Sequence, residues 1–165
     1  MPSWAKRASF AIALIALLPG WSFAEGRKPL TAECLSRVSS AYRVHPDVLF
    51  AILIVEGGTV GRNSASNSNG SYDIGPFQVN SMHRRALNEL GVSEEELRND
   101  GCINAAVAAW QLRRALPVER EAEIQNEDDY LRAIARYHSA TPKYNEIYAN
   151  KLRMAFAYIY SEGKR

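Results

Sequence analysis

One uninterrupted apolar run limits the folds that are open to this chain: "VLFAILIV" at 48–55 is followed directly by Glu56. Eight consecutive apolar residues have to be buried, either as a helix or as a strand. The Pro-Asp pair before the run suits the first turn of a helix, and the Gly-Gly pair after Glu56 suits its end. We therefore predict a helix over 46–56 that ends at Glu56, with a buried strand as the alternative.

Helical signals recur along the rest of the chain. Helical spacing of apolar residues marks four segments, which are 30–44, 102–116, 127–138 and 142–159. A capping box marks another short helix at 93–96. Pro117 ends the segment 102–116, because proline cannot continue a helix. The residues 161–165 are predicted to be a frayed tail. The chain is therefore expected to be mostly α.

A segment of different composition separates the apolar run from the later helices. Over 57–71, glycine, serine and asparagine make up 11 of 15 residues, which is typical of a flexible loop. The loop leads into "NGSYDIGPFQV", where Asn69-Gly70 is a hairpin signal between β-capable residues. We predict one small β-hairpin beside an otherwise helical domain.

The first 24 residues have the order of a secretory signal. Lys6 and Arg7 precede an apolar stretch at 8–18, and small residues precede a predicted cleavage site after Ala24. The apolar stretch has about 11 residues and is short for a membrane span, although an uncleaved anchor is the alternative. We expect a signal peptide at 1–24, a single domain at 25–165 and a periplasmic location.

Charge and histidine spacing narrow the possible partners. Removing the two basic residues of the signal leaves 18 basic and 18 acidic residues, so the formal net charge of +2 becomes 0. A neutral domain gives no electrostatic reason to expect nucleic acid as a partner. His45, His83 and His138 lack metal-ligand spacing. We expect no metal, no cofactor, no stable membrane insertion and a monomer.

Two cysteines, Cys34 and Cys102, remain in the exported domain. A single pair in an exported protein most often forms a disulfide, which here would close a loop of about 70 residues and stabilise the fold by roughly 4 kcal/mol. Two free thiols are the alternative. A cysteine nucleophile acting with His138 in a peptide-cleaving enzyme would require the pair to be unlinked.

Glu56 is the first candidate for catalysis. It follows the apolar run and lies at a predicted helix C-terminus. Burial and the negative end of the helix dipole both disfavour a charged carboxylate and raise its pKa towards the range of a general acid near neutral pH. The alternative is a structural glutamate that pairs with Arg62 or Arg136.

Asp73 is the second candidate. It lies between the Asn-Gly turn and a Gly-Pro pair, so it would project from the hairpin towards Glu56. Two carboxylates across a groove are the basic equipment of glycoside hydrolysis. A turn aspartate that bonds its own backbone is the alternative. Gln78 and Asn80, at alternate strand positions, would face one side and contact sugar hydroxyl and N-acetyl groups. The alternative is that they are only polar residues of an edge strand.

The segments "AILIVEGG", "NSNGSYDIGPFQVNS" and "ARYHS", in this order, resemble the lytic transglycosylase family. The most similar branch is the specialised one that accompanies type III and type IV secretion, conjugation and pilus machines. The resemblance covers about 32–160. The family's Gly-x-x-Gln element takes the form Gly75-Pro76-Phe77-Gln78, where the family more often has Gly-Leu-Met-Gln.

The resemblance implies a lysozyme-like α+β fold with the hairpin beside the cleft, and cleavage of the β-1,4 bond between N-acetylmuramic acid and N-acetylglucosamine in peptidoglycan. Glu56 falls on the family's catalytic glutamate, which protonates the leaving oxygen and then takes the proton of the muramoyl 6-hydroxyl, giving a 1,6-anhydro product. Gln78 and Tyr137 would position sugars. Phe77 would supply groove surface and backbone groups. Components of a secretion, conjugation or pilus machine are the implied protein partners.

Two departures from the family keep other functions open. Gly57 stands where the family usually has serine, which keeps a non-catalytic peptidoglycan-binding assembly protein as one alternative. Asp73 lies 17 residues after Glu56, as the second carboxylate does in animal-type lysozymes, which keeps a hydrolytic muramidase as another. The acidic segment 118–129 is either a docking site or solvated surface.

Overall fold

The fold is mostly helical and contains a two-stranded antiparallel sheet, which confirms the predicted lysozyme-like α+β class. The computed structural model describes residues 26–162, so the predicted signal peptide at 1–24 lies outside the described residues. In chain order the elements are α1 (Ala32–Tyr42), α2 (Pro46–Glu56), β1 (Asp73–Ile74), β2 (Val79–Asn80), a 3₁₀ turn (Ser81–His83), α3 (Arg84–Glu89), α4 (Glu94–Asn99), α5 (Gly101–Ala115), α6 (Val118–Glu121), α7 (Glu127–Ala135) and α8 (Pro142–Glu162).

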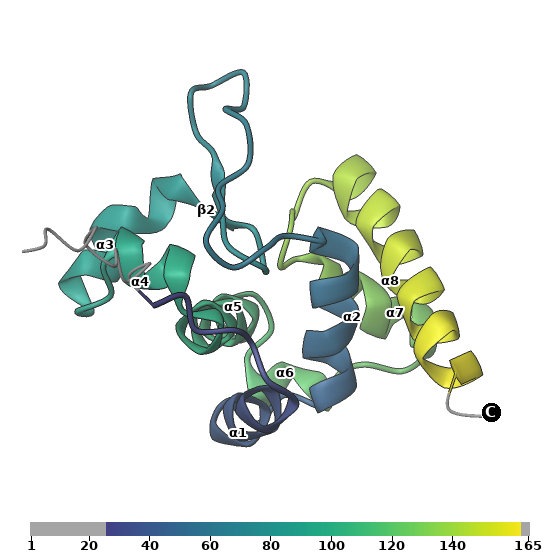
Figure 1. The fold of residues 1–165 in the computed structure, drawn as a ribbon. Helices are drawn as coiled ribbons and strands as arrows, with labels where there is room; N and C mark the ends of the chain where they lie inside the picture. Colours follow the sequence, from purple (N-terminus) through teal and green to yellow (C-terminus); the bar gives the residue numbers. More distant parts are fainter. Residues whose placement is uncertain (1–25, 163–165) are drawn as a thin grey trace, which may run out of the picture.

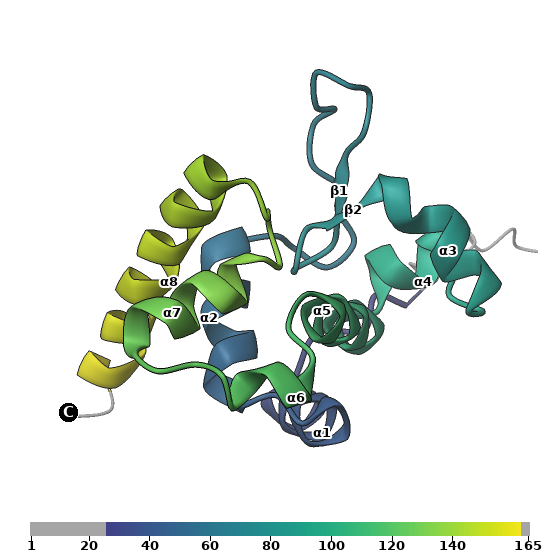
Figure 2. The ribbon, with the colours of Figure 1, turned by 180° about the vertical axis from the view of Figure 1, so that it is seen from behind.

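The apolar run forms helix α2, so the strand alternative is wrong. Figures 1 and 2 show α2 between α8 on one side and α1 with α5 on the other, and it contacts all three. Leu49, Ala51 and Ile52 are fully buried. Pro46 is in the first turn, and the αL residue Gly57 caps the end. The helix therefore ends at Glu56, as predicted.

Helix α5 packs against α1 through small side chains. Ala105, Ala108 and Ala109 are fully buried in the core and allow close approach. The predicted disulfide is present between Cys34 of α1 and Cys102 of α5, with their Cα atoms 5.8 Å apart. The two helices are therefore joined covalently as well as by packing.

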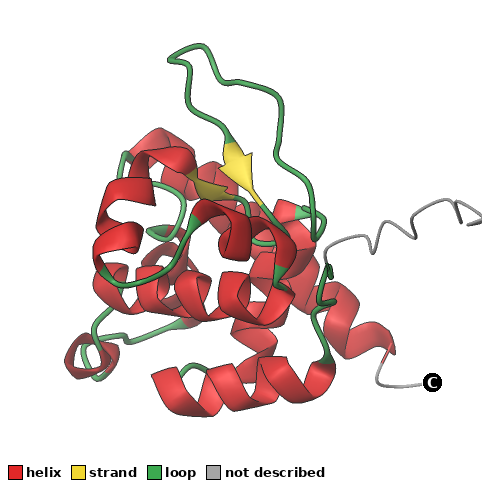
Figure 3. Ribbon diagram, turned by 60° about the vertical axis from the view of Figure 1, so that its left-hand side comes forward, coloured by secondary structure: helices red, strands yellow, loops and turns green. Residues whose placement is uncertain are grey.

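The hairpin differs from the prediction in its register. Asp73 pairs with Asn80 and Ile74 with Val79, so its turn is 75–78 and not Asn69-Gly70. The predicted turn residues instead lie in the long loop before β1, which stands above the helices in Figure 3. The glycine-containing segment 75–78 closes the sheet because it is held by contacts from outside the hairpin, which the local sequence does not reveal.

The two sides of the long loop before β1 are held together by backbone hydrogen bonds. Near its tip the backbone N–H of Asn67 donates to the carbonyl oxygen of Ser71 (2.6 Å), and at its base the N–H of Ser64 donates to the carbonyl oxygen of Asp73 (2.7 Å). The Asn-Gly signal thus marks a real turn, but one that folds 63–67 back against 71–74. Asp73 consequently has Asn80 of β2 on one side and Ser64 of the long loop on the other.

The later helices are confirmed with shifted ends. Helix α7 ends at Ala135 and not at 138, because the N–H groups of Tyr137 and His138 bond the carbonyl oxygens three residues back and tighten the last turn. Helix α8 continues through Glu162, beyond the predicted end at 159. Helix α4 has the predicted capping box at Ser93. Within 26–162 no single helix is long and apolar enough to cross a membrane; α1 and α2 would qualify together by length and composition but meet at a 119° bend.

Candidate active site

A cleft of about 590 Å³ opens between the hairpin, α5 and the segment that joins α7 to α8. Five of the predicted site residues line it, and these are Glu56, Asp73, Gln78, Asn80 and Tyr137. The other side chains around it are Asn67, His83, Gln111, Arg114, Ala115, Arg136 and His138. Residues from three other parts of the chain therefore line the cleft together with Glu56.

Glu56 is half-buried at the base of this cleft. The hydroxyl of Tyr148, on α8, donates a hydrogen bond to its Oε1 at 2.6 Å. Burial raises the pKa of Glu56 to about 7; the Tyr148 hydrogen bond and the charge of Lys151 oppose the rise, and the charge of Asp73 adds to it. Within 26–162 no ion pair joins Glu56 to an arginine, so the alternative of a paired structural glutamate is wrong.

Tyr148 belongs to an aromatic group that the sequence did not reveal as part of the site. The His138 ring stacks on it, with ring centroids 4.8 Å apart and planes at 4°, and the Tyr137 ring lies 6.5 Å away. Burial, then the charge of Glu56, raise the pKa of both tyrosines, so both hydroxyls remain donors. A helical stripe that included Tyr148 was the only sequence signal, since its partner Glu56 is 92 residues away.

Asp73 and Asn80 form a polar pair across the hairpin. The Nδ2 of Asn80 donates to Oδ1 of Asp73 at 2.8 Å, and both side chains line the cleft. The Asp73 carboxylate thus bonds a facing strand, in contrast to the alternative of a turn aspartate that bonds its own backbone. Its charge also contributes to the raised pKa of Glu56.

Gln78 and Phe77 occupy the turn in unexpected ways. Gln78 precedes β2 and has a φ of 49°, so it does not alternate with Asn80 along a strand, although both line the cleft. Its Nε2 donates to the carbonyl oxygen of Gly75 at 2.8 Å. The side chain of Phe77 is fully buried in the core, so it supplies no groove surface; instead its carbonyl oxygen accepts from the Tyr137 hydroxyl at 2.8 Å.

The two glycines after Glu56 allow a close junction between the end of α2 and the hairpin turn. Gly57 has a φ of 59°, a conformation in which any other side chain is strained. Gly58 donates its N–H to the carbonyl oxygen of Pro76 at 3.2 Å, and a Cβ at Gly58 would collide with the Gly75 carbonyl and the Gln78 amide. The end of α2 can therefore lie directly against the hairpin turn.

The chemistry of the cleft is that of a proton donor among hydrogen-bonding groups. A carboxyl with a pKa of about 7 can give up and regain a proton near neutral pH. The amides of Gln78 and Asn80 can bond ligand hydroxyl and carbonyl groups. In the part of the chain that the structure describes, no three histidine, cysteine, aspartate or glutamate side chains come together as a metal site.

This chain is similar to known proteins in two comparisons. The family model described as the transglycosylase SLT domain matches residues 33–159. Over 78 residues, 47% of this chain, the chain is 32% identical to invasion protein IagB of Salmonella typhimurium and 35% identical to protein IpgF of Shigella flexneri. Over 84 residues it is 27% identical to a peptidoglycan-binding-like protein of Escherichia coli O157:H7. These alignments span about half the length of each relative. Because the family model covers most of the chain and every residue that lines the cleft, the chain belongs to the transglycosylase SLT domain family.

Proposed function

We propose that this protein is a peptidoglycan lytic transglycosylase in which Glu56 is the general acid and base. The observation that carries the proposal is the half-buried Glu56 carboxyl with a pKa of about 7 at the base of a polar cleft. In a protein of this family, such a carboxyl is suited to the bond between N-acetylmuramic acid and N-acetylglucosamine. The Tyr148 hydrogen bond would hold the carboxyl in place.

The proton transfers of the reaction involve only this carboxyl and the substrate. Glu56 donates its proton to the bridging oxygen as the bond from that oxygen to C1 of the muramoyl sugar breaks. The resulting carboxylate then takes the proton of the muramoyl 6-hydroxyl, whose oxygen forms a new bond to C1. The products are a free 4-hydroxyl and a 1,6-anhydro end, no water is consumed, and Glu56 is protonated again.

In this proposal the other cleft residues bind the sugars and stabilise the positive charge that develops at C1 of the muramoyl sugar. The amides of Gln78 and Asn80 bond sugar hydroxyl and N-acetyl groups. The charge of Asp73 stabilises the positive charge that develops at C1. Tyr137, held by its bond to the Phe77 carbonyl, positions the muramoyl ring.

Product analysis on purified sacculi tests the proposal. The wild-type chain should release fragments that end in anhydro-muramic acid, detected by mass spectrometry. Glu56→Gln should lower the rate at least about 100-fold, because the general acid is lost. Glu89→Gln, at an exposed glutamate of α3, is the matched control and should cleave like wild type. Equal rates for wild type and Glu56→Gln would refute a catalytic role for Glu56.

A hydrolytic muramidase is the second candidate, favoured by Asp73 and Glu56 lining one cleft. The same digest distinguishes the two, since reducing ends without anhydro-muramic acid would replace the transglycosylase by the muramidase. Failure of the wild type to release any fragments would leave a non-catalytic peptidoglycan-binding protein. We also propose a periplasmic location and a role in opening the wall locally for a secretion or conjugation machine, with which the name of the relative IagB, an invasion protein, is compatible.

A further inference from the structure

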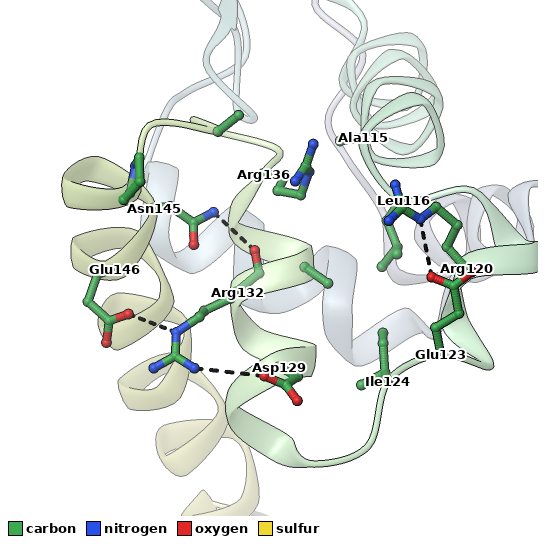
Figure 4. A pocket seen from close by; sticks show the side chains of 13 residues that line it. Ala115, Leu116, Arg120, Glu123, Ile124, Asp129, Arg132, Arg136, Asn145 and Glu146 are labelled. Atoms are coloured by element: carbon green, nitrogen blue, oxygen red, sulfur yellow. Dashed lines mark hydrogen bonds and ion pairs between the residues drawn. The ribbon is translucent and has the colours of Figure 1, made fainter.

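A second hollow, of about 450 Å³, adjoins the cleft. It lies between the end of α5 with α6 on one side and α7 with the start of α8 on the other (Figure 4). Ala115 and Arg136 line both the cleft and this hollow. A ligand bound in the cleft could therefore extend a branch past these two residues into the hollow.

The walls of the hollow combine small apolar surface with charges of both signs. Leu116, Ile124 and Ala133 are among its apolar lining. Figure 4 shows two arginines that are matched by acids: Arg120 pairs with Glu123 at 3.5 Å, and Arg132 pairs with Glu146 at 2.9 Å and with Asp129 at 3.9 Å. Such a surface suits an extended ligand that carries methyl groups and charges of both signs.

Arg136 differs from these two arginines. Among residues 26–162 no carboxylate lies within 4 Å of its guanidinium, and its side chain is exposed at the junction of the two hollows. Arg114 lies on the other side of this junction, next to Ala115; it is also without an acidic partner there and covers the Trp110 ring at 4.7 Å. Two exposed arginines thus border the region where a branch would leave the cleft: Arg136 lines both the cleft and the hollow, and Arg114 lines the cleft. Guanidinium groups prefer carboxylate partners.

We infer that the hollow binds the stem peptide of peptidoglycan, with Arg136 and Arg114 binding its carboxylates. This inference rests on the proposed function, since the stem peptide branches from the muramoyl sugar whose bond is cleaved. The peptide is elongated and contains alanine methyl groups, carboxylates and a diamino acid, which match the apolar, ion-paired and cationic parts of the hollow. The enzyme therefore selects strands that still carry peptides over strands from which peptides have been removed.

Binding measurements in a Glu56→Gln background test the inference without turnover. Glycan fragments with intact stem peptides are compared by calorimetry with the same fragments after amidase has removed the peptides. The fragments with peptides should bind about tenfold or more tightly, as expected for charge-assisted hydrogen bonds. Arg136→Ala, alone and with Arg114→Ala, should bring the ratio of the two affinities towards one, whereas Arg136→Lys should retain part of it. Arg85→Ala, at an exposed arginine of α3, should keep the ratio.

Two outcomes would overturn the inference: equal affinities for the two kinds of fragment, or an Arg136→Ala variant that keeps the full ratio. Melting curves of each variant verify that it is folded. The failure of the proposed function has a different signature. A wild-type chain that prefers fragments with peptides but never cleaves them would refute the proposed enzyme activity and support the peptide site. Cleavage without a preference for peptides would support the enzyme activity and refute the peptide site.

Discussion

A carboxyl whose pKa is about 7 is protonated in half of the molecules at neutral pH, so Glu56 can act as an acid in one step and as a base in the next. Its pKa results from opposing contributions. Burial dominates, and the Tyr148 hydroxyl, which bonds Oε1 and favours the charged form, limits the rise. The same hydroxyl cannot ionise in the relevant range, because burial and the nearby carboxylate raise its own pKa.

Replacing Tyr148 by phenylalanine should therefore change the pH profile of cleavage. Wild-type activity should fall as the pH rises through about 7, because the general acid loses its proton. In Tyr148→Phe the carboxylate loses a hydrogen-bond donor, its pKa rises, and the fall should move upwards by about one pH unit. The measurement is the initial rate of muropeptide release between pH 5 and pH 9 (about two units either side of neutral).

The conservative change leaves the ring in place, so the stacking of His138 on residue 148 is retained. Tyr144→Phe is the matched control, since Tyr144 is an exposed tyrosine on the same helix and its profile should equal that of wild type. A profile of Tyr148→Phe that is unmoved, or moved to lower pH, would contradict this account of Glu56.

At the residue scale the sequence singled out Glu56 as a candidate acid but did not reveal its environment. Glu56 was predictable because the apolar run and the Gly-Gly pair are contiguous with it. The partner was not, because Tyr148 reaches Glu56 only after α8 has packed on α2, and a helical pattern does not specify which distant helix it meets. The arginine partners considered from the sequence, Arg62 and Arg136, form no ion pair with it within 26–162.

Among the elements, the hairpin turn depends most on the rest of the chain. Asn104 of α5 is fully buried, and its Nδ2 donates to the carbonyl oxygens of Ile74 and Leu97, each at 2.9 Å. Its Oδ1 accepts from the N–H of Phe77 at 2.9 Å. One side chain thus satisfies three buried backbone groups and fixes the turn that presents Gln78 to the cleft.

Asn104→Ala should accordingly destabilise the protein by about 3 kcal/mol, because three buried backbone groups lose their partner. Urea unfolding followed by circular dichroism measures the change in the free energy of unfolding. Activity at low temperature should also fall, since Gln78 loses its fixed position. Asn88→Ala, at an exposed asparagine of α3, is the control and should change stability by less than about 0.5 kcal/mol. An equally small effect at Asn104 would contradict the role given to it.

The types of the elements were more predictable than the register of the hairpin, because the register depends on a residue that is distant in the sequence. The helices α1, α2, α5, α7 and α8 are marked by local periodicity and caps, and all were predicted. The hairpin register is set by Asn104, about 30 residues beyond the strands, and the nearby Asn-Gly pair gave the stronger local signal for a turn. The stretch 81–92, where the 3₁₀ turn and α3 lie, gave no comparable signal, and α6 lies within the acidic segment 118–129.

Across the whole molecule, α1 is attached to α5 at both ends. The disulfide joins the start of α1 to the start of α5. At the other end, Arg113 of α5 donates from Nε to the carbonyl oxygen of Tyr42 at 2.8 Å and from its guanidinium to that of Arg43. The native arrangement of these helices is thus supported without the covalent bond, so the disulfide should act mainly on the unfolded chain.

Removal of the disulfide should therefore lower stability without abolishing the fold. The bond links residues 68 apart in sequence, and its loss should reduce the free energy of unfolding by about 4 kcal/mol in the chain-entropy account, or roughly 10 °C in Tm. Calorimetry of wild type with and without dithiothreitol, and of the Cys34→Ala, Cys102→Ala double variant, measures it. Dithiothreitol should have no effect on the double variant. Because neither cysteine lines the cleft, cleavage well below the Tm should persist in the double variant. A wild-type Tm that is insensitive to dithiothreitol, with both thiols shown to be free by alkylation, would contradict a stabilising bridge between α1 and α5.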